Sequence, residues 1–166
     1  MNGASASRYL VALGSNRRRH RVGSPREVVA AAMEELAALG TVTARSPVID
    51  TAPLGPAQRR FANAAAIVET ELDPEAMLSA LKRMEREFGR RSGQRWGDRV
   101  LDCDLILWSE GHWQSDRLAV PHPEFRRRDF VLGPAHTIAG EWRDPISGAT
   151  VAQLFARLTR PRRVPS

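Results

Sequence analysis

The 166-residue sequence has only one cysteine, Cys103, and no apolar run of about 18 residues. A single cysteine excludes an internal disulfide framework and fits a reducing compartment, so we expect a cytoplasmic protein. The lack of long apolar runs predicts that nothing spans a membrane. The first residues, Met1 to Ser7, lack the apolar core of a signal peptide. No cluster of histidine and cysteine has the spacing of a zinc site.

Lysine is also scarce: Lys82 is the only one among 25 basic residues, and the net charge is +6. Arginine binds planar anions through paired hydrogen bonds, which suits nucleic acid or phosphorylated ligands. The arginine bias of a GC-rich genome explains surface arginines equally well. Neither a G-x-x-x-x-G-K-[ST] loop nor a G-x-G-x-x-G loop occurs. Any nucleotide site must therefore be built from arginines and a metal.

Hydrophobic periodicity and capping signals predict alternating strands and helices. One helix begins at Ser24-Pro25 and ends at Gly40, and another begins at Asp73-Pro74 and ends at Gly89. A short helix over 130–139 is interrupted by Pro134, and a capping box at Thr150 begins a last helix to about Leu158. The expected strands are 8–13, 41–50 with an edge or bulge at Pro47, 61–72, a central strand 99–108, and short pieces at Trp113 and 118–120.

The order β-α-β-β-α-β with C-terminal additions predicts an α+β ferredoxin-like plait. In this fold an antiparallel-rich sheet carries helices on one face. We expect a single compact domain over residues 8–160. Residues 1–7 and 161–166 are expected to be disordered or frayed ends.

Two carboxylates stand out on the strand expected at 99–108. Side chains alternate along a strand, so Asp102 and Asp104 project from the same face, while Leu101, Cys103, Leu105 and Leu107 face the core. Paired acids on an apolar strand are costly unless they are neutralised. A magnesium pair or the upstream arginines Arg95 and Arg99 can neutralise them, and magnesium accepts carboxylate and phosphate oxygens. The alternative is an exposed strand face with solvated acids.

The preceding basic loop suggests a phosphate clamp. Arg90, Arg95 and Arg99 surround Trp96, whose ring can stack on a flat ligand. A surface loop with one anchored tryptophan is the simpler alternative. His122 lies between two prolines beside a triple arginine, in a setting that favours function, although a lone histidine is more often structural. Cys103 is interpreted as a packing residue because strand parity directs it to the core.

Several ordered motifs resemble those of one known family, the 6-hydroxymethyl-7,8-dihydropterin pyrophosphokinases of folate biosynthesis. They are Ala12-Leu13-Gly14-Ser15-Asn16, Thr51-Ala52-Pro53-Leu54-Gly55, Phe61-Ala62-Asn63-Ala64-Ala65, Glu85 with Gly89-Arg90, Arg95-Trp96-Gly97-Asp98-Arg99 leading to Asp102-Cys103-Asp104, and Val120-Pro121-His122 with Arg128-Asp129-Phe130. The resemblance covers about Arg8 to Leu158. It implies an ATP-dependent diphosphokinase that moves the diphosphate of ATP to the pterin hydroxymethyl oxygen and releases AMP.

The resemblance also implies roles for individual residues. The catalytic set is Arg90, Arg99, Asp102 and Asp104, and the last two hold two magnesium (Mg2+) ions that bridge the ATP phosphates. The implied ATP site comprises Leu78, Lys82, Glu85, Arg90, Arg95, Trp96, Arg99, Leu105, Arg117, Leu118, His122 and Arg128. The implied pterin site comprises Gly14, Thr51, Ala52, Pro53, Leu54, Phe61, Asn63, Trp96, Asp102 and Phe130, with Asn63 on the hydrogen-bonding edge of the pterin and Phe61 and Phe130 as ring-stackers.

The sequence departs from the family pattern without losing an expected metal ligand or phosphate-binding arginine. Asp98 stands where proline is usual, Ala52 where proline is common, and Phe61 where tyrosine is frequent. We expect an active, monomeric enzyme with small-molecule partners and neither nucleic-acid nor membrane partners. Two alternatives stay open: a weak relative that only binds ATP or pterin, and a basic RNA-binding ferredoxin-like module. This sequence lacks the aromatic pair that strands of such RNA-binding modules carry.

Overall fold

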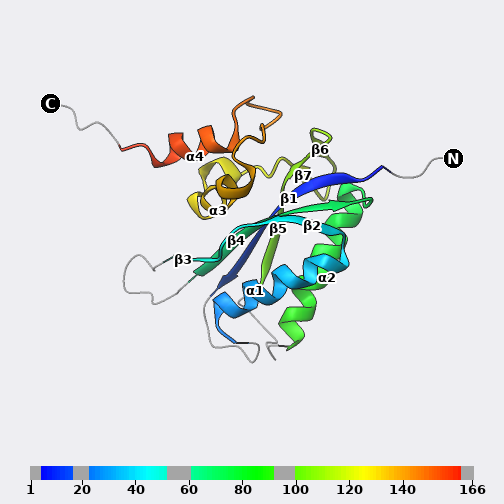
Figure 1. Ribbon diagram of the computed structural model, residues 1–166. Helices are drawn as coiled ribbons and strands as arrows, with labels where there is room; N and C mark the ends of the chain where they lie inside the picture. The colour runs from blue at the N-terminus through cyan, green and yellow to red at the C-terminus, as the bar shows by residue number, and fades with distance from the viewer. Residues whose placement is uncertain (1–4, 17–22, 52–60, 92–99, 162–166) are drawn as a thin grey trace.

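The computed structural model of the chain describes residues 5–16, 23–51, 61–91 and 100–161 (Figure 1). Their main sheet is antiparallel, with β4 (Phe61–Thr70) and β1 (Ser7–Asn16) in its middle. Strands β2 (Thr41–Arg45) and β3 (Ile49–Thr51) both pair with β4, and β5 (Asp102–Trp108) pairs with β1. The sheet is therefore antiparallel-rich, as predicted.

Pro47 divides the strand expected over 41–50 into two, which confirms the predicted interruption. Proline has no N–H to donate to a strand partner. Ser46 maintains the connection to β4, because its side-chain oxygen and its N–H both bond to the backbone of Ala65, at 2.8 and 2.9 Å. Only Pro47 and Val48 thus separate Ser46 from Ile49, where the chain resumes pairing with β4 as β3.

Strand β5 departs from the sequence prediction in two ways. Within the described residues it lies at an edge of the sheet rather than in the centre, and it begins at Asp102. The pairing with β1 shifts so that Ile106 is an extra residue, since Leu105 faces Val11 and Leu107 faces Leu10. Such a bulge reverses the alternation of side chains beyond it. Leu107 consequently packs on the opposite side of the sheet from Cys103 and Leu105, so its expected orientation was wrong.

Two helices cover one face of the sheet, as the plait predicts. They are α1 (Pro25–Glu35), continued by a 3-10 helix (Leu36–Ala38), and α2 (Pro74–Arg91). The expected caps are present: Ser24 accepts from the N–H of Glu27 at 3.2 Å, and Asp73 accepts from that of Ala76 at 2.8 Å. Helix α2 continues two residues past Gly89, the expected end. A first hydrophobic core fills the space between these helices and the sheet.

The C-terminal additions cover the other face (Figure 1). After the short strands β6 (Trp113–Gln114) and β7 (Ala119–Val120), the chain forms a 3-10 helix (Phe125–Arg127), α3 (Asp129–Ala139) and α4 (Val151–Thr159). A second hydrophobic core lies under them. The expected interruption at Pro134 does not occur, because α3 runs through it with the proline ring buried.

The result is the expected α+β ferredoxin-like arrangement, with helices on both faces of its sheet once the additions are included. Strand β1 begins at Ser7, which pairs with Thr70. Residues 1–4 and 162–166 lie outside the described residues. Among the helices that the structure describes, none is long and apolar enough to cross a membrane.

Candidate active site

The sheet register aligns several of the predicted site residues on neighbouring strands. Gly14 of β1 is paired on one side with Asn63 of β4 and on the other with Asp102 of β5. One step along, Ala12 is paired with Asp104. Directly paired residues project from the same face of a sheet, so Asn63, Asp102 and Asp104 share the face that α3 covers further along.

Glycine at position 14 makes room for the amide of Asn63. A Cβ atom added to Gly14 would lie 2.9 Å from Asn63 Oδ1, which is closer than real Cβ contacts. Asn63 is almost completely buried, so its amide cannot move freely into solvent. The pair therefore presents a fixed hydrogen-bonding group at the end of the sheet, as a pterin-recognising amide requires.

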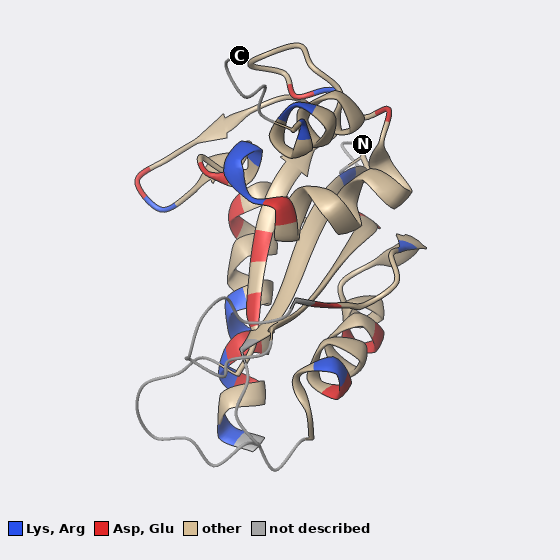
Figure 2. Ribbon diagram, turned by 90° about the vertical axis from the view of Figure 1, so that its left-hand side faces the viewer, with Lys and Arg blue, Asp and Glu red and all other residues tan. Residues whose placement is uncertain are grey.

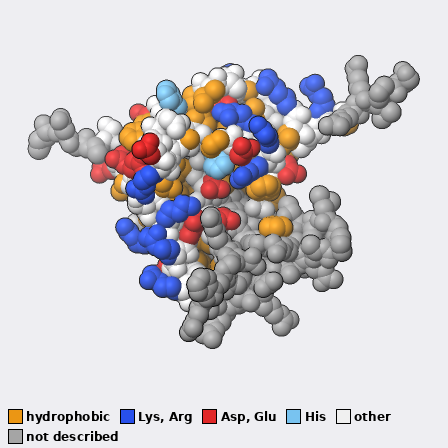
Figure 3. Space-filling view, turned by 180° about the vertical axis from the view of Figure 1, so that it is seen from behind, with side chains coloured by type: hydrophobic (Ala, Val, Ile, Leu, Met, Phe, Trp, Pro, Cys, Tyr) orange, Lys and Arg blue, Asp and Glu red, His pale blue; other side chains and the backbone are white. Residues whose placement is uncertain are grey.

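The two carboxylates differ in their surroundings. Asp102 is exposed, whereas the Asp104 side chain is 36% exposed and lies 4.0 Å from Nη1 of Arg128. Arg128 precedes α3, and its guanidinium is 5.7 Å from the centre of the Phe130 ring. Acidic positions on β5 are red in Figure 2, and Figure 3 shows acidic, basic and histidine side chains beside one another on one face. The site thus combines two carboxylates with the Arg128 guanidinium, which can bind a phosphate.

His122 reaches the same region from the segment after β7. Its N–H donates to the carbonyl of Ile106 at 3.0 Å, which attaches the segment to the bulged part of β5. Its Nδ1 accepts from the N–H of Glu124 at 3.1 Å, so the neutral ring carries its proton on Nε2. Burial lowers the pKa of His122, and Arg128 lowers it further, although Asp104 and Glu124 oppose this. The neutral imidazole is therefore a hydrogen-bond donor at Nε2.

Helix α2 contributes an ion pair at the edge of β5. Lys82 Nζ lies 3.0 and 3.2 Å from the two oxygens of Glu85, and the N–H of Cys103 donates to Glu85 Oε1 at 3.3 Å. Burial raises the pKa of Glu85, although Lys82 and the Cys103 N–H oppose the change. Glu85 thus satisfies a backbone donor that an edge strand leaves unpaired. Cys103 is buried in the first core, which confirms its interpretation as a packing residue.

The other described residues of the implied ATP site lie along α2, on β5 and in the β6–β7 hairpin. Leu78 is partly buried and Leu105 is buried in the first core. Arg117 donates to Ser79 Oγ of α2 at 3.5 Å, and its neighbour Leu118 packs against the same core. Arg90, in the last turn of α2, is exposed and forms an ion pair with Glu87.

Apolar side chains remain exposed around Asn63. Phe61 and Phe130, the expected ring-stackers, are each 39% exposed. Ile49 of β3 is 37% exposed and is paired with Asn63, so it shares the face of the site. Sequence reasoning missed Ile49, because its position beside Asn63 depends on the pairing of β3 with β4. An exposed apolar surface beside a polar amide suits a flat heteroaromatic ligand.

The remaining predicted site residues lie at the end of β3 or outside the described residues. Thr51 pairs through its backbone with Phe61. Outside the described residues lie Ala52, Pro53, Leu54, Arg95, Trp96, Asp98 and Arg99.

The donor set around Asp102 and Asp104 fits magnesium. Within the described ranges, no group of three or more His, Cys, Asp or Glu side chains could hold a metal ion. Magnesium does not need such a cage, because it is usually bound by one or two carboxylates together with substrate phosphates and water. Asp102 and Asp104 are accessible and share one face, so both can contribute to ions that also bind a triphosphate.

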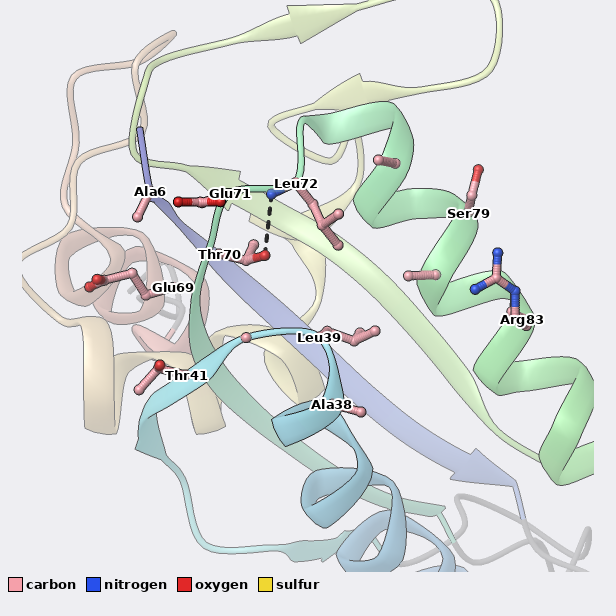
Figure 4. Close-up of a pocket in the computed structure, with 13 residues that line it drawn as sticks. Ala6, Ala38, Leu39, Thr41, Glu69, Thr70, Glu71, Leu72, Ser79 and Arg83 are labelled. Carbon is pink, nitrogen blue, oxygen red and sulfur yellow. Dashed lines mark hydrogen bonds between the residues drawn. The ribbon is translucent and has the colours of Figure 1, made fainter. Parts of the chain in front are cut away.

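A separate pocket of about 710 Å³ lies between α2 and the end of β4 (Figure 4). Its walls come from the end of the first helix, the end of β4 and the start of α2, including Leu39, Thr70, Leu72, Ser79 and Arg83. It contains none of the predicted site residues. The pocket is therefore not part of the predicted ATP and pterin sites.

Comparisons with known proteins identify related sequences. The family model of 7,8-dihydro-6-hydroxymethylpterin-pyrophosphokinase (HPPK) matches residues 10–140. The 2-amino-4-hydroxy-6-hydroxymethyldihydropteridine pyrophosphokinase of Pseudomonas aeruginosa is 40% identical over 90% of both chains. The protein with the same description from Methylorubrum extorquens is 37% identical over 92% of this chain and 94% of its own. That from Synechocystis sp. is 38% identical, but the match covers 63% of this chain and 53% of the relative.

Solved structures resemble the chain at the level of the fold. The crystal structure of an HPPK-DHPS protein of Plasmodium falciparum with pteroate has a TM-score of 0.72. It is 12% identical to this chain, and the match covers 95% of this chain and 41% of that one. This likeness shows a shared fold.

Proposed function

Because the chain belongs to the 7,8-dihydro-6-hydroxymethylpterin-pyrophosphokinase family, we propose that it transfers the diphosphate of ATP to the hydroxymethyl group of 6-hydroxymethyl-7,8-dihydropterin in folate biosynthesis. The hydroxymethyl oxygen attacks the β-phosphorus of ATP. The bond from that phosphorus to the oxygen bridging to the α-phosphate breaks, AMP leaves, and the hydroxyl proton passes to solvent. Such transfers depend mainly on positioning and charge neutralisation.

The observation that carries this proposal is the alignment of Asn63, Asp102 and Asp104 on one face beside Arg128. Asn63 hydrogen-bonds the edge of the pterin, and Phe61 and Phe130 pack on its faces. Asp102 and Asp104 would hold two magnesium ions, which would supply positive charge to the phosphate oxygens.

The basic residues bind the triphosphate from the other side. Arg128 presents a planar guanidinium that can meet two phosphate oxygens at once. His122 donates from Nε2, and Arg90 and Arg99 complete the set of phosphate ligands. Glu85, held by Lys82 and the backbone of β5, lies on the nucleotide side together with Leu78, Arg117 and Leu118. The proposal also includes a monomeric, cytoplasmic protein whose catalytic domain spans residues 8–160.

Product analysis tests the proposed reaction directly. Purified protein is incubated with ATP, magnesium and 6-hydroxymethyl-7,8-dihydropterin, and the nucleotides and pterins are separated. We expect AMP and a pterin diphosphate ester in equal amounts, and no turnover after chelation of magnesium. A pterin without the hydroxymethyl group is the matched control and should yield neither product. Formation of ADP in place of AMP would contradict the proposal.

A further inference from the structure

We propose that Asp144 is a positioning residue for this reaction, acting through Arg126 to fix the segment that presents Arg128 to the phosphates. The inference rests on the proposed function, because it assigns Arg128 to ATP. Asp144 lies in the turn between α3 and α4, outside the implied ATP and pterin sites. It touches neither substrate in the proposal. Its effect on turnover would be transmitted by the short 3-10 helix Phe125–Arg127.

Both oxygens of the Asp144 carboxylate accept hydrogen bonds. Its side chain is fully buried and receives two parallel bonds from Arg126, Nε at 2.6 Å and Nη2 at 2.8 Å. The hydroxyl of Ser147 donates to the same carboxylate at 2.6 Å, and the N–H of Ile146 donates at 3.0 Å. A bidentate arginine–carboxylate pair fixes orientation as well as distance. Arg126 therefore has one defined position.

Backbone hydrogen bonds hold the turn that carries Asp144. Its own N–H donates to the carbonyl of Ala149 at 2.9 Å, and its carbonyl accepts from the N–H of Gly148 at 2.8 Å. The N–H of Val151, the first residue of α4, donates to the carbonyl of Trp142 at 2.9 Å. These backbone hydrogen bonds fix both ends of the turn, and the position of the Asp144 carboxylate is fixed with it.

The connection along the chain from Arg126 to the site is short. Arg128 is two residues further along and immediately precedes α3, and its N–H donates to the carbonyl of Phe125 at 3.2 Å. The ring of Phe125 is fully buried, and the Arg126 guanidinium lies 4.7 Å from its centre. Only Arg127 separates the anchored Arg126 from Arg128, so a displacement of the backbone at Arg126 also moves Arg128.

The three consecutive arginines then have separate tasks. Arg126 points to Asp144, the largely exposed Arg127 lies 3.8 Å from Glu124, and Arg128 lies 4.0 Å from Asp104. A shift of the segment 126–128 would direct the three arginine side chains to different partners. Buried ion pairs contribute little net stability compared with apolar packing, but they can specify one register. Asp144 selects the register in which Arg128, and not its neighbours, faces the carboxylates of the site.

Steady-state kinetics of Asp144→Asn test the proposal, since asparagine keeps the shape and loses the charge. We expect kcat/KM for ATP to fall about tenfold or more, because small displacements of a binding group have effects of that size. Arg126→Lys keeps the charge but loses the bidentate geometry, and it should show a smaller loss. Leu36→Ala, at a fully buried position of the first core, is the control for lost stability. At temperatures where all variants are folded, Leu36→Ala should keep the wild-type kcat/KM.

A double-mutant cycle with Arg128→Lys separates positioning from general damage. If Asp144 acts through Arg128, the loss caused by Asp144→Asn should largely disappear when Arg128 is already replaced. Fully additive losses, or a loss in Asp144→Asn no larger than in Leu36→Ala, would overturn the inference. If Asp144→Asn does not fold, the same cycle with Arg126→Lys decides. A wild-type protein that forms no AMP would instead refute the proposed function.

Discussion

At the scale of single residues, the candidate pterin site depends on a missing side chain. Gly14 and Asn63 are paired across two strands, and the Asn63 amide occupies the space that a Cβ at position 14 would need. Glycine is needed at position 14 because the Asn63 amide lies so close to its backbone. It is not needed for an unusual backbone conformation, since Gly14 is not among the glycines with positive φ. One methyl group is therefore enough to disturb the recognition of the proposed pterin substrate.

Replacement of Gly14 by alanine should weaken pterin recognition selectively. The new Cβ would lie 2.9 Å from Asn63 Oδ1, so the amide must move. We expect KM for the pterin to rise about tenfold, equivalent to the loss of one hydrogen bond of about 1.4 kcal/mol. KM for ATP is the internal control and should change little. Equal increases in both constants would contradict a specific role of Asn63.

Replacement of Asp104 by alanine should abolish magnesium-dependent turnover without unfolding the protein. Asp104 is partly exposed and lies on an edge strand, so its carboxylate is not needed for core packing. We expect kcat to fall at least about a hundredfold, the scale seen when one stabilising charge interaction is removed from an active site. Glu34→Ala, an exposed acid on α1, is the matched control and should be as active as the wild type. Near wild-type activity of Asp104→Ala would refute the metal assignment.

At the scale of elements, the edge strand β5 and the last helices shape the site. The bulge at Ile106 turns Leu107 into the second core, while Asp102 and Asp104, before the bulge, keep their common face. Bulges commonly redirect side chains next to active sites. Helices α3 and α4 then pack over the same face and bring Arg128 and Phe130 to the carboxylates.

The capping box of α4 provides a test at this scale. Thr150 Oγ1 accepts from the N–H of Gln153 at 3.1 Å, and Gln153 Oε1 accepts from the N–H of Thr150 at 2.9 Å. Thr150→Ala removes the first bond and should lower the free energy of unfolding by about 1 kcal/mol. Urea denaturation measures this change. Thr150→Ser preserves the acceptor and should keep most of the stability; equal losses in both variants would argue against the cap.

At the scale of the whole molecule, one sheet carries a hydrophobic core on each face. On the side of the second core, the ion pair of Asp144 and Arg126 joins the turn between α3 and α4 to the 3-10 helix before α3. Burial by itself would raise the pKa of Asp144. The hydrogen bonds from Arg126, Ser147 and the N–H of Ile146 outweigh it and lower the pKa to about 2. Because the folded pKa lies below that of an unfolded aspartate, about 3.9, the carboxylate stabilises the folded state above about pH 4.

The pH dependence of unfolding should therefore differ between the wild type and Asp144→Asn. We expect the wild type to be more stable by about 2 kcal/mol at pH 5 to 7, the value of a shift of nearly two pKa units. The difference should shrink as the pH falls from about 4 towards 2, where the wild-type carboxyl binds its proton. Urea unfolding at several pH values measures both curves. A difference that does not change with pH would show that the charge of Asp144 is not the cause.

The sequence alone determined the features that depend on neighbours along the chain. The caps at Ser24, Asp73 and Thr150 and the break at Pro47 appear where they were expected. Strand alternation placed Asp102 and Asp104 on one face, and the ordered motifs indicated the family. These features are set by bonds and steric limits that span only a few residues, so the order of the residues is sufficient to predict them.

The tertiary structure decided which strand lies at the edge, where β5 bulges and whether α3 continues through Pro134. A bulge depends on the partner strand, so Leu107 could not be oriented from alternation alone. A proline inside a helix costs about 3 kcal/mol, and burial of α3 against the second core offsets this cost. The pairing of Ile49 with Asn63 and of Arg126 with Asp144 joins segments distant in sequence. Such contacts exist only once both faces of the sheet are packed.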